Sequence, residues 1–508
     1  MELTIIRQPI AACGPVLATT AEQPIECDVL LPDYCPDIVR VLCCQAAGVV
    51  TDAAVRGDRF VVDGMATVTV CYVGEGGVTK RTEYKIPFSK TIELKFEPKS
   101  PVYSITIDQG YLNCRATSRR RLDIRGTLVL GIKIQDVREE QAVADASGMG
   151  VQVRPQEVDL TRISGQSIRQ FNVTEDLQPP AGKPAVGEIV RCGCRAEVQE
   201  CRAVAGRAVL KGALFVHILY RPEPDDGRLY TADFELPVSQ LLELSGAPEE
   251  APCEVNLTVS SCEITTGEYD GNEQLRLSAQ LVASVCFYQS GTASVATDCF
   301  STRFRAEGKQ RSVRAMRLLG MANERHTMRE MIDLPEGFEE LTDLWADASR
   351  CYSRMENGVL TVYCHLSVSL LCRVIDVGQD YNELQYDLEI PVPVDGADAM
   401  TELSPKVSVQ SVNLSPSGQQ AQLVCELLVT GPVIGNEEHP VLTEIQVDEN
   451  EPRTGDPTVG LTIYYASAGE NVWDISKRYG ALPGQVMADN DLDGDAIREH
   501  TALIIPTA

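Results

Sequence analysis

The chain has 508 residues, of which 44% are hydrophobic and 23% are charged, so it is long enough for several domains with separate cores. Its formal net charge of −28 argues against binding to nucleic acid or to an anionic membrane, because both partners require a basic surface. No apolar run approaches the roughly 20 residues of a membrane-spanning helix, so we expect no membrane span.

The N-terminal region contains a sequence that could be taken for a lipoprotein cleavage box, Ile10-Ala11-Ala12-Cys13-Gly14. Only nine residues precede it, and Glu2, Arg7 and Pro9 are among them, so there is no apolar signal region. We therefore expect no lipidation and a cytosolic site of synthesis. The 18 cysteines lie mostly in apolar, strand-like runs, which indicates free thiols in a reducing compartment rather than a disulfide framework.

Two phrases occur three times along the chain. Each copy has a strand-like segment of alternating apolar and polar residues, followed by a short phrase centred on Ile-Pro or Leu-Pro. The prolines of that phrase recur at about 150 residues, far longer than the unit of a solenoid, so we interpret the copies as whole domains. The strand-like segments are 60–72, 208–220 and 358–370, and the proline phrases are 84–88, 234–238 and 388–392.

A third phrase precedes the strand-like segments. Residues 31–42 of the first copy correspond to residues 184–190 of the second, and the spacing from Pro36 to Gly64 equals that from Pro184 to Gly212. Only residues 334–337 represent this phrase in the third copy, which we therefore expect to be shortened. The alternation favours half-buried antiparallel strands, and the prolines predict strand edges or ends. The fold expected is mainly β, with three related β-sandwich-like domains over 1–155, 156–305 and 332–448.

The segment from Arg303 to Arg329 is locally basic and contains scattered apolar residues. We interpret residues 306–331 as a connector between the second and third domains, with a helix as one option. The more specific alternative is a basic amphipathic helix that docks on a partner. Residues 449–458 have the composition of a linker and separate the last fifty residues or so from the rest of the chain.

The last segment, 459–508, predicts a strand, two helices and a closing strand. Asn471 suits the N-cap of the first helix and Gly480 its C′ position, while Val472, Ile475 and Tyr479 fall on one face and are expected in the core. Pro483 suits the first turn of a second helix that ends near Asn490. The flanking strands are expected at 461–465 and 503–506.

This segment resembles the LysM domain. The resemblance rests on Tyr465, on Gly469-Glu470-Asn471, on Trp473-Asp474-Ile475 and on Asp489-Asn490-Asp491. It implies a small βααβ fold that binds N-acetylglucosamine-containing glycans in a groove between 469–472 and 490–495. Glu470-Asn471 stands where the family has Asp-Thr, and the second wall is unusually acidic. The candidate binding residues for a partner or a glycan are Gly469, Glu470, Asn471, Val472, Trp473, Lys477, Asn490, Asp491, Leu492 and Asp493.

Trp473 has two interpretations. It can be a partly buried tryptophan that packs at the edge of the helix core, which is the commoner role, or an exposed aromatic anchor for a protein partner.

The order of β repeats followed by one terminal LysM segment resembles the SipL-type spore morphogenesis family, whose repeats are SPOCS domains. The resemblance implies a non-enzymatic scaffold that is made in the mother cell and recruited to the forespore surface and spore coat. It also implies that the LysM region binds the morphogenetic ATPase of the coat basement layer, and self-association is compatible with it. The alternative is a protein that binds peptidoglycan through the LysM groove.

The residues predict no catalytic site, metal or cofactor. The histidines are scattered, and His217 and His365 lie in corresponding apolar β segments, as satisfied core residues do. Cys192-Gly193-Cys194 lacks the two-residue separation of zinc or redox pairs and has no second pair. Phosphate-binding loops and nucleophile elbows are missing from the sequence. We therefore expect a protein that is not an enzyme.

Overall fold

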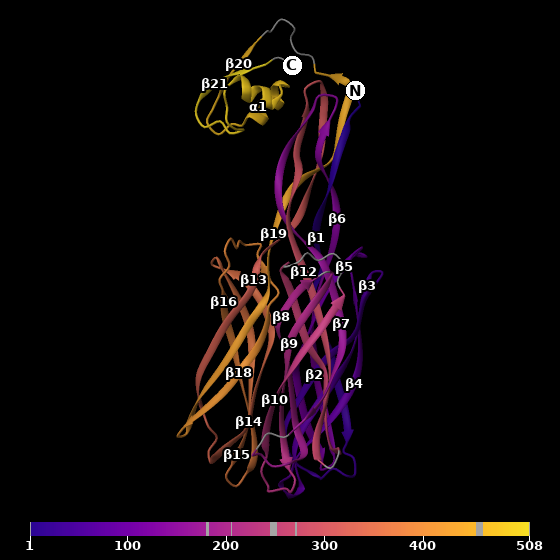
Figure 1. Ribbon diagram of the computed structural model, residues 1–508, viewed down its shortest axis with the longest axis vertical. Helices are drawn as coiled ribbons and strands as arrows, with labels where there is room; N and C mark the ends of the chain where they lie inside the picture. Colours follow the sequence, from indigo (N-terminus) through magenta and orange to yellow (C-terminus); the bar gives the residue numbers. More distant parts are fainter. Residues whose placement is uncertain are drawn as a thin grey trace.

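Strands make up most of the chain in the computed structural model (Figure 1), which describes residues 2–178, 182–204, 206–243, 251–269, 272–453 and 461–506. The expectation of a mainly β fold is confirmed. The same order of six long strands occurs three times, and we call these stretches the first, second and third unit.

The first unit contains β1 (Thr4–Leu30), β2 (Ile38–Arg56), β3 (Arg59–Gly74), a short 3-10 turn (Glu75–Gly77), β4 (Thr79–Glu93), β5 (Pro101–Ser118) and β6 (Arg121–Ser147). The second contains β7 (Val151–Leu177), β8 (Val186–Val204), β9 (Arg207–Pro222), β10 (Tyr230–Glu243), β11 (Cys253–Tyr269) and β12 (Asn272–Ser301). The third contains β13 (Phe304–Asp333), β14 (Phe338–Glu356), β15 (Val359–Val374), β16 (Gly378–Val392), β17 (Glu402–Leu403), β18 (Lys406–Ser417) and β19 (Gln420–Pro452).

Each unit pairs its first strand with its last, antiparallel and over nearly their full length: β1 with β6, β7 with β12 and β13 with β19. The last strand also pairs with β5, β11 or β18. The three strands between form a separate meander sheet, β2-β3-β4, β8-β9-β10 or β14-β15-β16. The prolines of the Ile/Leu-Pro phrase lie in β4, β10 and β16, which are outer strands of these sheets, as the missing N–H of proline requires.

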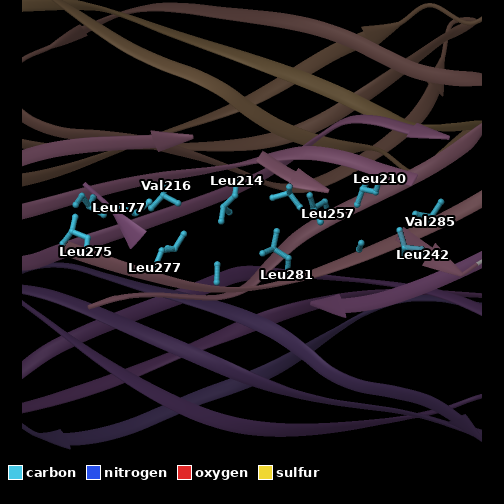
Figure 2. Packing of buried hydrophobic residues seen from close by; sticks show 14 of the residues in the cluster. Leu177, Leu210, Leu214, Val216, Leu242, Leu257, Leu275, Leu277, Leu281 and Val285 are labelled. Atoms are coloured by element: carbon cyan, nitrogen blue, oxygen red, sulfur yellow. The ribbon is translucent and has the colours of Figure 1, made fainter. Parts of the chain in front are cut away.

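The two sheets of each unit pack face to face over an apolar core. In the second unit, Leu210 and Leu214 of β9 face Leu257 of β11 and Leu277 and Leu281 of β12 (Figure 2). Alternate residues of β9 are buried over much of its length, because successive side chains of a strand point to opposite faces. The apolar positions of the period-2 pattern in the sequence are therefore the residues that form this core. Equivalent clusters fill the first and third units.

The long strand pairs continue beyond the sandwiches and wind around one another into a stem (Figure 1). Apolar side chains from all three pairs meet inside it, so no pair can bury its inner face alone. The stem core consists of Ile10, Ala142, Val143, Ala146, Met149, Val151, Val158, Ala293, Val295, Ala296, Cys299, Val313, Ala315, Val441, Leu442 and Ile445.

The three meander sheets meet edge to edge: β4 contacts β8, β10 contacts β14 and β16 contacts β2. Ion pairs cross these junctions. Lys80 lies 2.7 Å from Glu188, Arg40 lies 2.9 Å from Asp380, and Arg191 lies 3.0 Å from Asp343. The meander sheets are thus joined in a ring in which each unit contacts both others.

The expectation of a connector over 306–331 is wrong, and so is its helical option. This segment belongs to β13, which pairs with β19 from Phe304↔Pro452 to Asp333↔Gln420. Arg311, Arg314 and Arg317 of this strand form ion pairs with Glu140, Glu402 and Glu437.

Because β13 corresponds to β1 and β7, the third unit has a counterpart of each strand and is not shortened. Of the linker expected over 449–458, residues up to Pro452 belong to β19, and 454–458 lie outside the described residues.

The shared stem core predicts that a cavity inside it destabilises the protein. Leu442 is fully buried there, and Leu442→Ala should lower the free energy of unfolding by about 2–5 kcal/mol. Leu30→Ala is the matched control, because that leucine, in β1, is 71% exposed and its loss should change stability by less than about 0.5 kcal/mol. Chemical denaturation followed by circular dichroism measures both, and equal effects would contradict the shared core.

Candidate functional site

The C-terminal module, which we define as residues 461–506, has the element order β20 (Thr462–Ala466), α1 (Val472–Tyr479), α2 (Pro483–Asp489) and β21 (Thr501–Ile505). β20 and β21 pair antiparallel, and the helices cover one face of this two-stranded sheet over a small core. Its relation to the LysM family stays a prediction.

Local signals in the sequence position α1. The side chain of Asn471 accepts a hydrogen bond from Asp474 N at 2.7 Å, and Gly480 has φ 70°, as the predicted N-cap and C′ roles require. Val472 and Ile475 are buried as expected. The expectation that Tyr479 is a core residue is wrong, because it is exposed and its ring packs at 5.7 Å from that of Tyr464 at the surface.

The structure brings together the two walls of the predicted groove. Gly469 N donates to Ile497 O, Ile497 N donates to Glu470 O and Val472 N donates to Asp495 O, at 2.8–2.9 Å. The Glu470 carboxylate accepts hydrogen bonds from Ser467 N and from the Tyr464 hydroxyl, both at 2.7 Å, which lower its pKa. The first wall is thus a closed turn whose acidic side chain is held within the module.

The second wall is tied to the module by Asn490. Its amide donates to Val486 O and to Ile504 O, both at 2.8 Å, and accepts from Ile504 N at 2.6 Å. These bonds join the end of α2 to β21 and use the side chain fully. Leu492 N donates to Met487 O at 3.0 Å, and the side chains of Asp491 and Asp493 are exposed.

Trp473 and Lys477 both contact the second unit. The indole Nε1 of Trp473 donates to Asp298 Oδ2 at 2.8 Å, and Lys477 Nζ lies 2.6 Å from Asp298 Oδ1. The rings of Trp473 and Phe300 meet edge to face at 5.0 Å. Trp473 is only 5% exposed, so it packs, and it packs on β12 rather than within its module alone.

Two arginines complete this docking contact between the module and the end of the stem. Arg154 of β7 lies 2.8 Å from Asp495, and Arg453, which follows β19, donates to Lys477 O at 2.9 Å. Burial alone would raise the pKa of Asp298, but its hydrogen bonds from Lys477 and Trp473 outweigh burial and lower it. Asp298 therefore stays ionised and anchors the module. Sequence reasoning missed it, since nothing local marks a partner 175 positions from Trp473.

The opposite face of the module exposes an apolar row. Ile463 and Tyr465 project from β20, Leu461 directly precedes that strand, and Ile504 of β21 is the cross-strand partner of Ile463. Tyr465 is 78% exposed. In Figure 1, α1 lies on the side of the module nearer the stem and the strands lie farther away. We call these four residues the outer row, and docking of the module through α1 leaves them uncovered by the rest of the described chain.

A cavity of about 540 Å³ lies where the three meander sheets meet. Charged side chains from all three units line it, among them Arg81, Arg191, Asp347 and Glu383. The Asp347 carboxylate is open to the cavity but surrounded by protein, and burial raises its pKa.

One of these groups, Arg191, belongs to a bonded network at the junction of the second and third units. The guanidinium of Arg191 lies 3.8 Å above the Trp345 ring. The buried carboxylate of Asp343 accepts from Arg191 and lies 2.9 Å from His217 Nε2. His217 Nδ1 lies 2.6 Å from Asp233, so the imidazole bridges two carboxylates. This network is positioned to hold the two units together.

Comparison with known proteins gives one family match. Residues 185–266 match the model described as "SipL, SPOCS domain", and this segment covers the meander sheet of the second unit and nearly all of β11. No curated protein and no solved structure matches the chain. The match supports a role related to the spore coat. Among the described residues, no helix is both long and apolar enough to cross a membrane.

The docking contact predicts a fluorescence change. In a Trp345→Phe background, Trp473 is the one remaining tryptophan of the two in the chain. Asp298→Ala removes charge-assisted hydrogen bonds worth about 1.5–3 kcal/mol, so Trp473 emission should shift to the red and its quenching by acrylamide should increase. Asp493→Ala, an exposed acidic residue of the same module, is the control and should change neither. Unchanged quenching in Asp298→Ala would contradict the docking.

The His217 bridge predicts a pH dependence. Burial lowers the pKa of His217, but the hydrogen bonds and charges of Asp343 and Asp233 outweigh it and raise the pKa. The stabilisation is therefore complete below the unfolded-state pKa of about 6.5 and is lost as pH rises through the folded-state value. The native protein should be more stable than His217→Gln, and this difference in the free energy of unfolding should be larger near pH 6 than near pH 9. His500→Gln, at an exposed position of the module, is the control. A difference that grows with pH would contradict the bridge.

Proposed function

We propose that this protein is a non-enzymatic scaffold in spore coat assembly and that its C-terminal module binds a protein partner. The observation that carries the proposal is the outer row, an exposed apolar strip on a module whose other side is fixed to the stem. The family match at 185–266 supports the setting, the spore coat. The scaffold would be made in the mother cell and recruited to the forespore surface.

The arrangement of contacts supports the outer row as the partner-binding surface. Trp473 and Lys477 are engaged with Asp298, so a partner that meets the intact protein reaches the outer row and the exposed residues of the groove walls first. An aromatic side chain such as Tyr465, flanked by aliphatic neighbours, is typical of the residues that dominate binding energy at protein interfaces. By the resemblance to the SipL-type family, the partner we propose is the morphogenetic ATPase of the coat basement layer.

Binding of peptidoglycan through the groove has weaker support. The side-chain amide of Asn490 is hydrogen-bonded to Val486 and Ile504, and the carboxylate of Glu470 is hydrogen-bonded to Ser467 and Tyr464. Both side chains are therefore poorly placed to recognise a sugar. The exposed side chains of Asp491 and Asp493 in the second wall are acidic and favour a basic partner over a neutral glycan.

The double substitution Ile463→Ser/Tyr465→Ser tests the proposal. Truncating an aromatic anchor and its neighbour should cost about 2 kcal/mol or more, so recovery of the ATPase with the tagged protein from sporulating cells should fall at least tenfold. Leu482→Ser, an exposed leucine outside the outer row, is the matched control and should bind normally. Deletion of 459–508 should delocalise the partner from the forespore.

Two outcomes would contradict the proposal. Normal ATPase recovery with the double variant would exclude the outer row. Saturable co-sedimentation with purified peptidoglycan, abolished by substitutions at 469–471, would favour the glycan-binding alternative instead.

A further inference from the structure

Three cysteine thiols of the second unit converge between its two sheets. Cys192 and Cys194 are two positions apart on β8 and therefore project from the same face, toward β11, which contributes Cys262. The Sγ atom of Cys192 lies 3.6 Å from that of Cys194 and 3.8 Å from that of Cys262, and all three sulfur atoms lie within 4.8 Å of one another. Cys262 is 70 positions from Cys192, so the sequence pattern alone showed a pair and not a triad.

The spacing of the sulfur atoms suits a bound zinc ion. Zinc–thiolate bonds of about 2.3 Å in tetrahedral geometry place neighbouring sulfur atoms about 3.8 Å apart. Thiols in van der Waals contact have similar separations, but three protein ligands with one open position also make up a zinc site, and this cluster supplies three. The thiols are partly buried against the apolar core of the sandwich, so an ion there would be shielded from water on most sides.

The charges around the triad also favour a cation bound by thiolates. Arg81 and Arg191 line the same cavity as Cys192, so two positive charges lie near the triad. Three thiolates and one Zn²⁺ carry a net charge of −1, which the nearby arginines offset. Each coordinating thiol gives up its proton to solvent, and no electron is transferred.

The first unit contains an incomplete version of the same cluster. Cys44 stands eight positions after Pro36, as Cys192 stands eight after Pro184, and its thiol hydrogen-bonds to Cys114 of β5, the counterpart of β11. The position that corresponds to Cys194 is Ala46. The first unit thus offers two thiols where the second offers three, and it shows that an alanine at this position is compatible with the sandwich.

We propose that Cys192, Cys194 and Cys262 bind one Zn²⁺ ion, which joins β8 to β11 across the sandwich of the second unit. The three thiolates leave one coordination position for water or a small exogenous ligand. The ion would act as a cross-link between the two sheets, in a protein whose described cysteines are otherwise free thiols.

The test uses the full-length protein, purified under reducing, oxygen-free conditions and equilibrated with buffered Zn²⁺. Elemental analysis should find one zinc per chain, and Co²⁺ in its place should give the absorption of thiolate-to-cobalt charge transfer. Cys194→Ala and Cys262→Ser should each lower zinc content to less than a tenth, while Cys44→Ser, at the two-thiol cluster, should keep it.

Three results would overturn the proposal. These are less than a tenth of an equivalent of zinc in the native protein, equal zinc content in Cys194→Ala, and loss of zinc in Cys44→Ser. Cys194→Ala recreates the first unit's arrangement and should fold, and circular dichroism is the check on its folding. The test therefore holds even where Cys262→Ser disturbs the sandwich.

Discussion

The apolar core of the stem is the constraint on which the rest of the structure depends. Each unit ends in a long antiparallel strand pair whose inner face is apolar. Exposure of that face to water is unfavourable, and the sandwich of the same unit does not bury it. Val143, Val295 and Leu442, one from each pair, are buried against the other two pairs. The hydrophobic effect therefore favours only the state in which all three units are wound together. This arrangement turns three sandwiches into one body and gives the C-terminal module a fixed platform.

Ionic contacts complement the stem at the other end of the molecule. The ring of meander sheets is crossed by one or more ion pairs at each junction, and the buried carboxylate of Asp343 is fully engaged by Arg191 and His217. Charges this well buried add little net stability compared with an apolar contact, but they penalise any arrangement that leaves them unpaired. We interpret the apolar stem as the main stabilising contact between the units. The ion pairs of the ring fix how the units are aligned with one another.

Local patterns in the sequence were good guides to local structure and poor guides to contacts between distant segments. Period-2 alternation predicted the strands, and Asn471 and Gly480 predicted both ends of α1, because those signals act within a few residues. The β13 strand was mistaken for a connector because it is rich in arginine, and the acidic partners that make this favourable lie on other strands. Asp298 as the anchor of Trp473, and Cys262 as the third thiol, were invisible for the same reason: each depends on how two units or two sheets meet.

The central claim is that the three strand pairs form one cooperative unit. Native-state hydrogen exchange, measured over a range of denaturant, tests this most directly, because it reports the free energy of opening for each amide. The backbone amides of Val143, Val295 and Val441 lie in the three different pairs. All three amides should exchange through the same global unfolding, with a common free energy and a common dependence on denaturant. Three distinct opening free energies, one for each unit, would contradict it.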